Sequence, residues 1–320
     1  TEAITLGEEF LQLADEEDDE AARIVGHMNL GVIHLSRGKL EIAESQFQSV
    51  LALYDAERHA SLKFTYAYDP KVICSGYLAW AQLALGRPDD ALEASLQSVA
   101  FAKDLSHALS LGFALHRSAA VHQLRRDVEA VEATAAEMAA LADKQGFATY
   151  RAQARLYQGW AMVQRGAIDE GAGLLTESLD DLRAIKDEDF FPHTMCMVAE
   201  GFFAQGKLDQ ALALLNQAKQ RTTDNEELWF QAEVHRLIGE VTAAQSDEAE
   251  AEKSLLHALE LAGEQKGALW ELRAALSLAK VWDGQGRSSE AKKLLTPICA
   301  RFSQGLNTAD VKQAKALLEG

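Results

Sequence analysis

The chain is poor in cysteine, proline and positive charge, and each shortage excludes a class of protein. Its three cysteines, Cys74, Cys196 and Cys299, lie more than a hundred residues apart. An odd number without the short spacing of metal ligands excludes a disulfide framework and a thiolate metal site, and it indicates reduced core thiols in a cytoplasmic protein. The four prolines among 320 residues suit many helices joined by short turns.

Positive charge is scarce relative to negative charge. The 31 lysines and arginines are outnumbered by 49 aspartates and glutamates, so the net charge is −18. Such a chain repels phosphate backbones and anionic membrane surfaces, which argues against nucleic acid and membrane partners. The sequence has no stretch of about 18 apolar residues and no basic start before an apolar segment, so we expect neither a membrane span nor a signal peptide.

What the sequence does have is an internal repeat marked by small residues at turns. Gly-x-x-x-x-Ala, or a variant of it, starts at positions 38, 86, 126, 166, 206, 246 and 286, which are separated by one step of 48 and five of 40. We call these seven positions rungs. A small residue stands seven positions before each rung: Gly31, Ala79, Ala119, Gly159, Ala199, Gly239 and Ala279. Small side chains let helices cross closely, so each unit is predicted to be a helix A, a tight turn and a helix B.

The second helix of most units carries a large apolar residue nine positions after the rung: Phe47, Leu175, Leu215, Leu255 and Leu295. Repeats two and three have Ser95 and Ala135 there instead. We predict that the large residues fill the space between neighbouring helix pairs. The turn of the second repeat agrees with a division into first and second helices. Pro88 followed by Asp89 and Asp90 is favourable at the start of a second helix.

The repeat predicts an all-α fold, an α-α superhelix of about seven helix pairs in a single domain, 1–320. The pairs are expected near 21–56, 70–104, 109–143, 149–184, 190–221, 227–263 and 269–302. The next rung back falls before Thr1, and the first residue is not Met, so 1–14 is expected to be the second helix of a truncated repeat. The extra eight residues of the long step fall near 62–70, and 307–318 is expected to form a capping helix.

These small-residue spacings resemble the tetratricopeptide repeat, lengthened from its usual 34 residues to 40. The longer form is similar to the helical domain of the bacterial maltose-regulon activator. Several strings also resemble the C-terminal region of bacterial proteins that join a class III adenylate or guanylate cyclase domain, a signalling ATPase and helical repeats: 78–86 (LAWAQLALG), 158–161 (QGWA), 232–240 (AEVHRLIGE), 271–275 (ELRAA) and 291–297 (AKKLLTP). The resemblance implies a sensor, scaffold or regulatory arm attached to catalytic domains.

No pattern in the chain predicts catalysis, a cofactor or a metal. Residues 201–207 match the first seven positions of a P-loop, but Leu208 stands where Ser or Thr must bind magnesium, and no strand precedes the segment. The acidic run at 15–20 lacks the spaced ligands and glycine of a calcium loop, so we interpret it as a solvated turn. His27 and His34 lie two helical turns apart, where packing or capping is a better interpretation than metal binding. We therefore expect no enzyme activity from this chain.

Candidate binding residues come from projecting the repeat onto the inner, concave surface, which first helices line in such superhelices. The projection takes positions thirteen, ten and six residues before a rung. The candidates are Trp80, Phe113, His116, Trp160, His193, Glu200, Glu233, Arg236, Glu240, Arg273 and Lys280. Aromatic residues precede charged ones, as a groove for an amphipathic peptide or polar ligand requires. The alternative is structural: ion pairs such as Glu200 with Arg236 or Glu240 with Lys280, and tryptophans packed on neighbouring helices.

Three functions remain open at this point. The first is a protein-interaction or regulatory domain of a multidomain bacterial signalling protein, with a peptide, a protein or the upstream domains of the same chain as partner. The second is a solenoid that senses a small-molecule effector, as the maltose activator does. The third is a homodimerisation scaffold for paired catalytic domains. The residues do not decide among these functions, nor whether the superhelix closes on itself.

Overall fold

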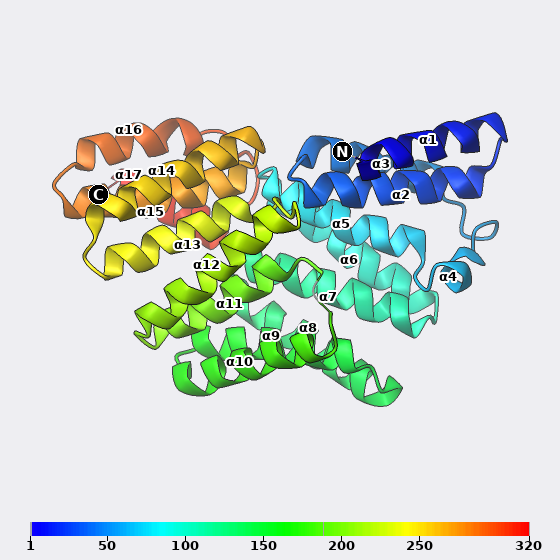
Figure 1. Ribbon diagram of the computed structural model, residues 1–320, viewed down its shortest axis with the longest axis horizontal. Helices are drawn as coiled ribbons and strands as arrows, with labels where there is room; N and C mark the ends of the chain where they lie inside the picture. The colour runs from blue at the N-terminus through cyan, green and yellow to red at the C-terminus, as the bar shows by residue number, and fades with distance from the viewer. Residues whose placement is uncertain (1, 188, 320) are drawn as a thin grey trace.

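The computed structural model describes residues 2–187 and 189–319, and this part of the chain is entirely helical (Figure 1). The helices are α1 (Glu2–Glu16), α2 (Glu20–Ser36), α3 (Leu40–Leu53), α4 (Leu62–Thr65), α5 (Pro70–Ala84), α6 (Pro88–Asp104), α7 (Ala108–Leu124), α8 (Val128–Gln145), α9 (Ala148–Gln164), α10 (Ile168–Ala184), α11 (Phe191–Ala204), α12 (Leu208–Asp224), α13 (Gln231–Ala244), α14 (Glu248–Glu264), α15 (Ala268–Gly284), α16 (Ser288–Cys299) and α17 (Ala309–Glu319). The predicted all-α fold class is confirmed.

The helices form consecutive antiparallel pairs, from α2 with α3 to α15 with α16. These pairs lie within four residues of the ranges expected from the rungs. Helix α1 covers most of 1–14, where a helix was expected, and α17 follows the last pair. The extra eight residues of the long step lie in the connection 54–69, which contains the short helix α4.

All seven rungs adopt the left-handed backbone conformation. Five of them are glycine, with φ between 68° and 89°, whereas Arg126 has φ 61° and Ser246 has φ 66°. When the residue just after a helix is left-handed, the last carbonyls of the helix accept hydrogen bonds from the N–H groups that follow. This ends the first helix and reverses the chain. Arg126 and Ser246 therefore make the same turn without glycine.

Where the small residue of a first helix is glycine, it lies against the large residue of the second helix. A Cβ atom on Gly31 would stand 2.4 Å from the Phe47 ring, and one on Gly239 would stand 2.6 Å from Cγ of Leu255. Phe47 and Leu255 are fully buried. Ser95 is also buried, and its hydroxyl makes a 3.1 Å hydrogen bond with that of Ser118. The predicted crossing of helices at small residues matches these contacts.

The superhelix closes on itself, because the turns of its first repeats contact its last repeats. The carbonyl of Ser36, at the end of α2, accepts the backbone N–H groups of Leu228 at 2.6 Å and Trp229 at 3.1 Å. Gln304 accepts the backbone N–H of Asp89 at 2.9 Å. Ion pairs join Arg37 with Glu226 and Glu41 with Lys266. Figure 1 shows the two ends of the chain as separate arms that meet above the middle repeats.

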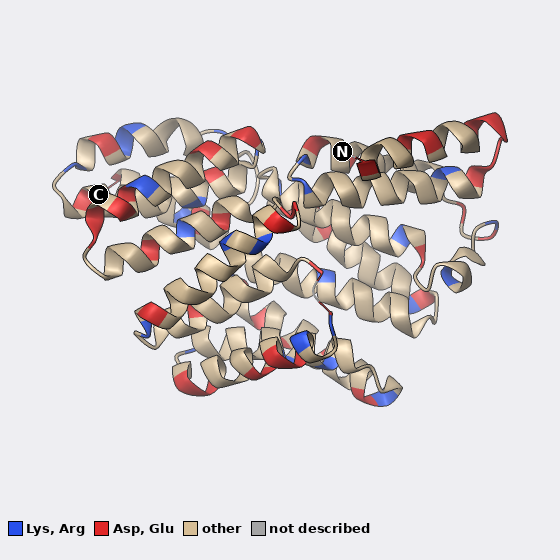
Figure 2. Cartoon of the chain, in the orientation of Figure 1, with Lys and Arg blue, Asp and Glu red and all other residues tan. Residues whose placement is uncertain are grey.

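Acidic residues outnumber basic ones, 49 to 31, and they recur along many of the helices (Figure 2). Within residues 2–187 and 189–319, no helix is both long and apolar enough to cross a membrane.

We predict that Ser246→Gly stabilises the fold by about 1 kcal/mol, because a residue with a side chain is strained at φ 66°. Gly206→Ala is expected to lower the stability by a similar amount, because alanine is strained at this left-handed position. No atom lies within 4 Å of the added Cβ, so the loss would come from the backbone alone. Urea unfolding measures both changes. Ser45→Gly, at an exposed position in the middle of α3, is the control and should lower stability. If Ser246→Gly lowered the stability, the conclusion that Ser246 is strained in this turn would be wrong.

Candidate functional site

The eleven predicted residues lie on the first helices α5, α7, α9, α11, α13 and α15, as projected. Most of them face a filled interior rather than an open groove. The buried ones are Trp80, Phe113, Trp160, His193, Glu233, Arg236 and Arg273; His116, Glu200 and Glu240 are half-buried, and Lys280 is exposed. The closure of the superhelix accounts for this burial, since side chains from opposite repeats meet at its centre.

One half of the filled interior is an aromatic cluster around Trp80, with Phe190, His193, Trp229 and Trp270. The rings of Trp80 and Trp229 stack with centroids 4.8 Å apart, and the Trp80 indole N–H donates to the carbonyl of Arg117 at 3.1 Å. His193 shares a 2.9 Å hydrogen bond with Gln123, and burial lowers its pKa to about 3. A histidine that is neutral at physiological pH and packed among tryptophans has a structural role here.

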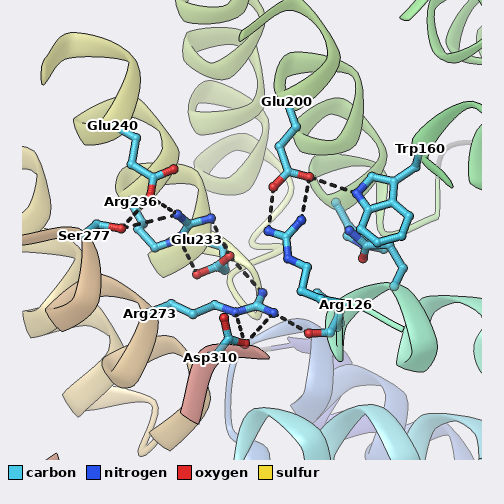
Figure 3. Close-up of polar contacts among 12 residues, drawn as sticks. Arg126, Trp160, Glu200, Glu233, Arg236, Glu240, Arg273, Ser277 and Asp310 are labelled. Atoms are coloured by element: carbon cyan, nitrogen blue, oxygen red, sulfur yellow. Dashed lines mark hydrogen bonds and ion pairs between the residues drawn. The ribbon is translucent and has the colours of Figure 1, made fainter. Parts of the chain in front are cut away.

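The other half is a network of charged side chains, which we call the inner polar network (Figure 3). Its members are Arg126, Glu200, Glu233, Arg236, Glu240, Arg273, Ser277 and Asp310. Five of the predicted residues belong to it, but Arg126 at a rung, Ser277 on α15 and Asp310 on α17 were not predicted. The network joins the turn after α7 to α11, α13, α15 and α17.

The ion pairs of the network differ from the two that the sequence suggested. Glu200 pairs with Arg126 at 2.7 Å instead of Arg236, and it also accepts the Trp160 indole N–H at 3.2 Å. Glu240 pairs at 2.7 Å with Arg236 of its own helix. Burial disfavours the charge on Glu200, but Arg126 together with Arg236 and Arg273 outweighs it, so the pKa of that carboxyl is lowered. The suggested pairs joined residues of adjacent repeats, whereas Arg126 reaches Glu200 from two repeats away.

Glu233 is the centre of the network because it holds two arginines. It pairs with Arg236 at 2.8 Å and with Arg273 at 3.2 Å, and all three side chains are buried. Arg273 also pairs with Asp310 at 3.0 Å and donates to the carbonyl of Leu124. A cavity of about 240 Å³ borders these residues. The exposed Lys280 also lines this cavity, whereas each arginine of the network already has a carboxylate partner.

An open groove remains at the N-terminal end of the concave surface. Its volume is about 600 Å³, and α1, α2, α5 and α7 supply most of its wall. The wall is mainly apolar; it comprises Ala3, Leu6, Gly7, Phe10, Gly26, Met28, Asn29, Val32, Ile33, Tyr68, Ile73, Tyr77, Phe113 and Asp189. Of the eleven predicted residues, only Phe113 lines it.

Sequence reasoning missed this groove although the same projection finds part of it. Thirteen, ten and six residues before the first rung stand Val25, Met28 and Val32. Met28 and Val32 line the groove, but aliphatic residues at these positions do not differ from core residues in a sequence. The contributions of α1 and Asp189 were not projected, because neither lies on a first helix of the seven pairs.

A polar cavity of about 340 Å³ adjoins the groove and shares Val32, Tyr77 and Asp189 with it. Glu227 lines this cavity with only 7% of its surface exposed, and one of its carboxyl oxygens has no hydrogen-bond partner among the described residues. Burial raises the pKa of Glu227 to about 8; Asp189 adds to the shift and Arg221 opposes it. The cavity lies beside Ser36, where the superhelix closes.

Tyr77 is held between the groove and a buried arginine. Its hydroxyl accepts a 2.8 Å hydrogen bond from Arg117, so the hydroxyl proton can be donated elsewhere. The Arg117 guanidinium lies 4.5 Å from the ring centres of Tyr77 and Trp80 and 4.7 Å from that of Phe113. These contacts stabilise a buried cation that has no carboxylate within ion-pair distance among the described residues, and they fix Tyr77 in the wall.

The structure also locates the residues of the motifs set aside above. His27 shares a 2.7 Å hydrogen bond with Gln46, and His34 is buried. No group of three or more His, Cys, Asp or Glu side chains suited to a metal ion occurs in residues 2–187 and 189–319. The P-loop-like segment 201–207 is the end of α11 and the turn that follows it.

Comparison with known proteins gives a fold likeness and one distant relative. No protein-family model matches the chain. An uncharacterized protein of Rhizobium meliloti (strain 1021) is 26% identical over 251 residues, which is 78% of this chain and 24% of that protein. The chain therefore spans about a quarter of the length of this relative.

Among solved structures, NprR in complex with its cognate peptide NprX has a TM-score of 0.58 at 13% identity, covering 92% of this chain and 82% of that one. A Rap protein complexed with Competence and Sporulation Factor has a TM-score of 0.56 at 9% identity, covering 93% and 97%. Aspartyl phosphate phosphatase F from Bacillus subtilis has a TM-score of 0.54 at 9% identity, covering 94% and 76%. At these identities the likeness shows that the fold is a tetratricopeptide-like helical repeat.

We predict that Glu233→Ala destabilises the chain by about 3–5 kcal/mol, because it leaves two buried arginines without this carboxylate. Denaturant unfolding measures the loss. Glu250→Ala, which removes only the exposed ion pair with Lys253, is the matched control and should change stability little. Equal effects of the two substitutions would contradict a closing role for the network.

We predict a pH-dependent stability difference between the wild-type chain and Glu227→Gln. The folded carboxyl has a pKa near 8 and the unfolded one a value near 4.5, so the folded state holds the proton more tightly. The wild type therefore loses stability relative to Glu227→Gln as the pH rises from about 4.5 to about 8. Thermal unfolding of both proteins from pH 5 to pH 9 tests this, and a constant difference would refute it.

Proposed function

We propose that the chain is a non-catalytic, regulatory protein-interaction domain that binds a peptide segment in the N-terminal groove. The observation that carries this proposal is the contrast between the filled centre of the superhelix and the open, mainly apolar groove of about 600 Å³. A large apolar concavity with a few polar groups is the usual form of a binding site. Two of the structural neighbours, NprR with NprX and the Rap protein with its factor, are peptide or factor complexes, which supports this type of ligand.

The proposal of a non-catalytic role rests on the state of the titratable groups. The buried carboxylates of the inner polar network are paired with arginines, and His193 is packed among tryptophans. No nucleophile, base and orienting group converge on the groove in the described residues. One neighbour bears the name of a phosphatase, but a likeness at 9% identity concerns the fold alone.

The parent of this domain is proposed to be a multidomain bacterial signalling protein with a cyclase and an ATPase domain. The support is the set of strings quoted above, of which 78–86 forms much of α5 and 232–240 forms much of α13. The bacterial relative is about four times as long as the segment that matches it, which agrees with a larger parent. In such a protein the groove would bind a segment of a partner or of the upstream domains.

A small-molecule effector is the second candidate, and the size and chemistry of the groove favour it. About 600 Å³ lies within the range of drug-sized ligand sites, and Asn29, Tyr77 and Asp189 supply isolated polar groups on an apolar wall. A metabolite screen by thermal shift separates the two candidates. A metabolite that raises the melting temperature, together with the absence of any peptide ligand, would favour the effector.

The peptide-binding role is tested by selection from a random 16-residue display library. We expect enrichment on the wild-type chain and loss of enrichment on Asn29→Trp, because Asn29 is exposed on the groove wall and a tryptophan there fills the groove. Asn216→Trp, at an exposed position of α12, is the matched control and should retain binding. Absence of enrichment, or equal enrichment on all three proteins, would contradict the proposed function.

A further inference from the structure

We propose that the polar cavity of about 340 Å³ binds a free α-amino acid, whose ammonium group pairs with Glu227 and whose carboxylate accepts a hydrogen bond from the Tyr77 hydroxyl. This site is separate from the peptide groove and goes beyond the proposed function. Three features of the cavity support it: a buried carboxyl oxygen without a partner, a lining that balances acidic and basic groups, and a volume suited to a small ligand.

The cavity lies at the joint where the superhelix closes. Its lining comes from four separate parts of the chain: Val32 and Ser36 of α2, Tyr77 of α5, Lys186, Asp189 and Phe190 between α10 and α11, and Arg221, Asn225 and Glu227 from the end of α12 and the turn after it. None of these residues belongs to α1 or α17. A ligand here contacts repeats that are distant in the sequence and meet at the closing contact, so its binding stabilises the closed form.

Glu227 supplies the buried group that a ligand satisfies. Only 7% of this residue is exposed, yet its Oε1 has no hydrogen-bond partner among the described residues. The other carboxyl oxygen, Oε2, lies 3.9 Å from Nε of Arg221, which is longer than a hydrogen bond. A buried polar atom without a partner costs about 1–3 kcal/mol, so native structures rarely leave one. An ammonium group brings three N–H donors and a positive charge, and both suit this oxygen.

The charges of the lining favour a zwitterion over a simple anion or cation. Asp189 and Glu227 oppose an anionic ligand such as phosphate. Lys186 and Arg221 oppose a ligand that carries only positive charge. Tyr77 adds a directed contact, because its hydroxyl already accepts a 2.8 Å hydrogen bond from a buried arginine and its own proton is left for an acceptor. A ligand with one ammonium and one carboxylate group matches all of these groups.

The volume of the cavity suits an amino acid. About 340 Å³ lies at the low end of the range for small-ligand sites, which is about 300–1,000 Å³. A single water molecule takes only about 30 Å³, so one water does not fill this space. Val32 and Phe190 add apolar surface beside the polar groups. A small ligand that combines two charged groups with an apolar side chain therefore fits the lining.

Binding at Glu227 is coupled to the release of a proton. Burial raises the pKa of this carboxyl to about 8; Arg221 and the backbone N–H of Phe191 oppose the shift, and Asp189 adds to it. The lining has two further titratable groups and none from α2: the Tyr77 hydroxyl and the Lys186 ammonium. An ammonium ligand needs the ionised carboxylate. The Kd should therefore fall by about ten-fold per pH unit up to about pH 8 and level off above it.

The test is titration of the chain with each of the twenty standard α-amino acids, by thermal shift and then by calorimetry. We expect at least one of them to raise the melting temperature and to bind. Its N-acetyl form, which lacks the positive charge, and its amide, which lacks the carboxylate, should each bind at least about ten-fold more weakly. If none of the amino acids binds, or if the N-acetyl form binds equally well, the inference is wrong.

Variants of the lining locate the ligand. Glu227→Gln should weaken the amino acid by at least about ten-fold and remove the pH dependence of its Kd, which a change in stability alone would not do. Lys186→Gln should weaken the amino acid by about two- to five-fold and leave its amide unchanged, because the amide has no carboxylate. Asp224→Asn removes an exposed carboxylate of α12 that does not line the cavity and should have no effect.

Asn29→Trp separates this site from the groove, because Asn29 lines the groove and not the polar cavity. Amino-acid binding that survives Asn29→Trp and is lost in Glu227→Gln supports the inference. The reverse pattern would place the amino acid in the groove and overturn it. Failure of the peptide selection would contradict the proposed function without changing the amino-acid titration, so the two failures are distinguishable.

Discussion

The contact between opposite repeats at the carbonyl of Ser36 determines how much of this superhelix is accessible. That oxygen accepts the N–H groups of Leu228 and Trp229, and it holds the first repeat against the sixth. Trp229 is thereby placed on Trp80, with ring centroids 4.8 Å apart. Because Glu233, Arg236 and Arg273 are buried at this centre, their charges need partners, and the inner polar network supplies them. The apolar groove is what remains open at the N-terminal end.

Regularities within a repeat could be predicted from the sequence because they are local. The left-handed turn at each rung and the small residue opposite Phe47 or Leu255 involve residues less than twenty positions apart. The partner of Glu200 could not be predicted in this way, since Arg126 lies 74 positions away and at a rung instead of a first helix. The groove could be predicted only in part, because Met28 and Val32 stand at projected positions of a first helix whereas the residues of α1 and Asp189 do not.

The closed centre also explains why most of the aromatic and charged candidates are buried. Aromatic and charged residues on a concave surface are usual candidates for ligand contacts. In this closed superhelix the same side chains pack in its interior and pair their charges with each other. The surface left for binding is mainly aliphatic. The groove adjoins the polar cavity beside Ser36 through Val32, Tyr77 and Asp189, so the binding surface and the closing contact share part of the wall.

The central claim, that binding occurs at the N-terminal groove and not at the centre of the superhelix, is tested most directly by photo-cross-linking. A library-selected peptide carrying a photoreactive apolar residue is irradiated with the wild-type chain, and the attachment sites are mapped by mass spectrometry. The account predicts attachment to α1, α2 and the first half of α5. Attachment confined to α13 and α15, near Lys280 and the inner polar network, would contradict it.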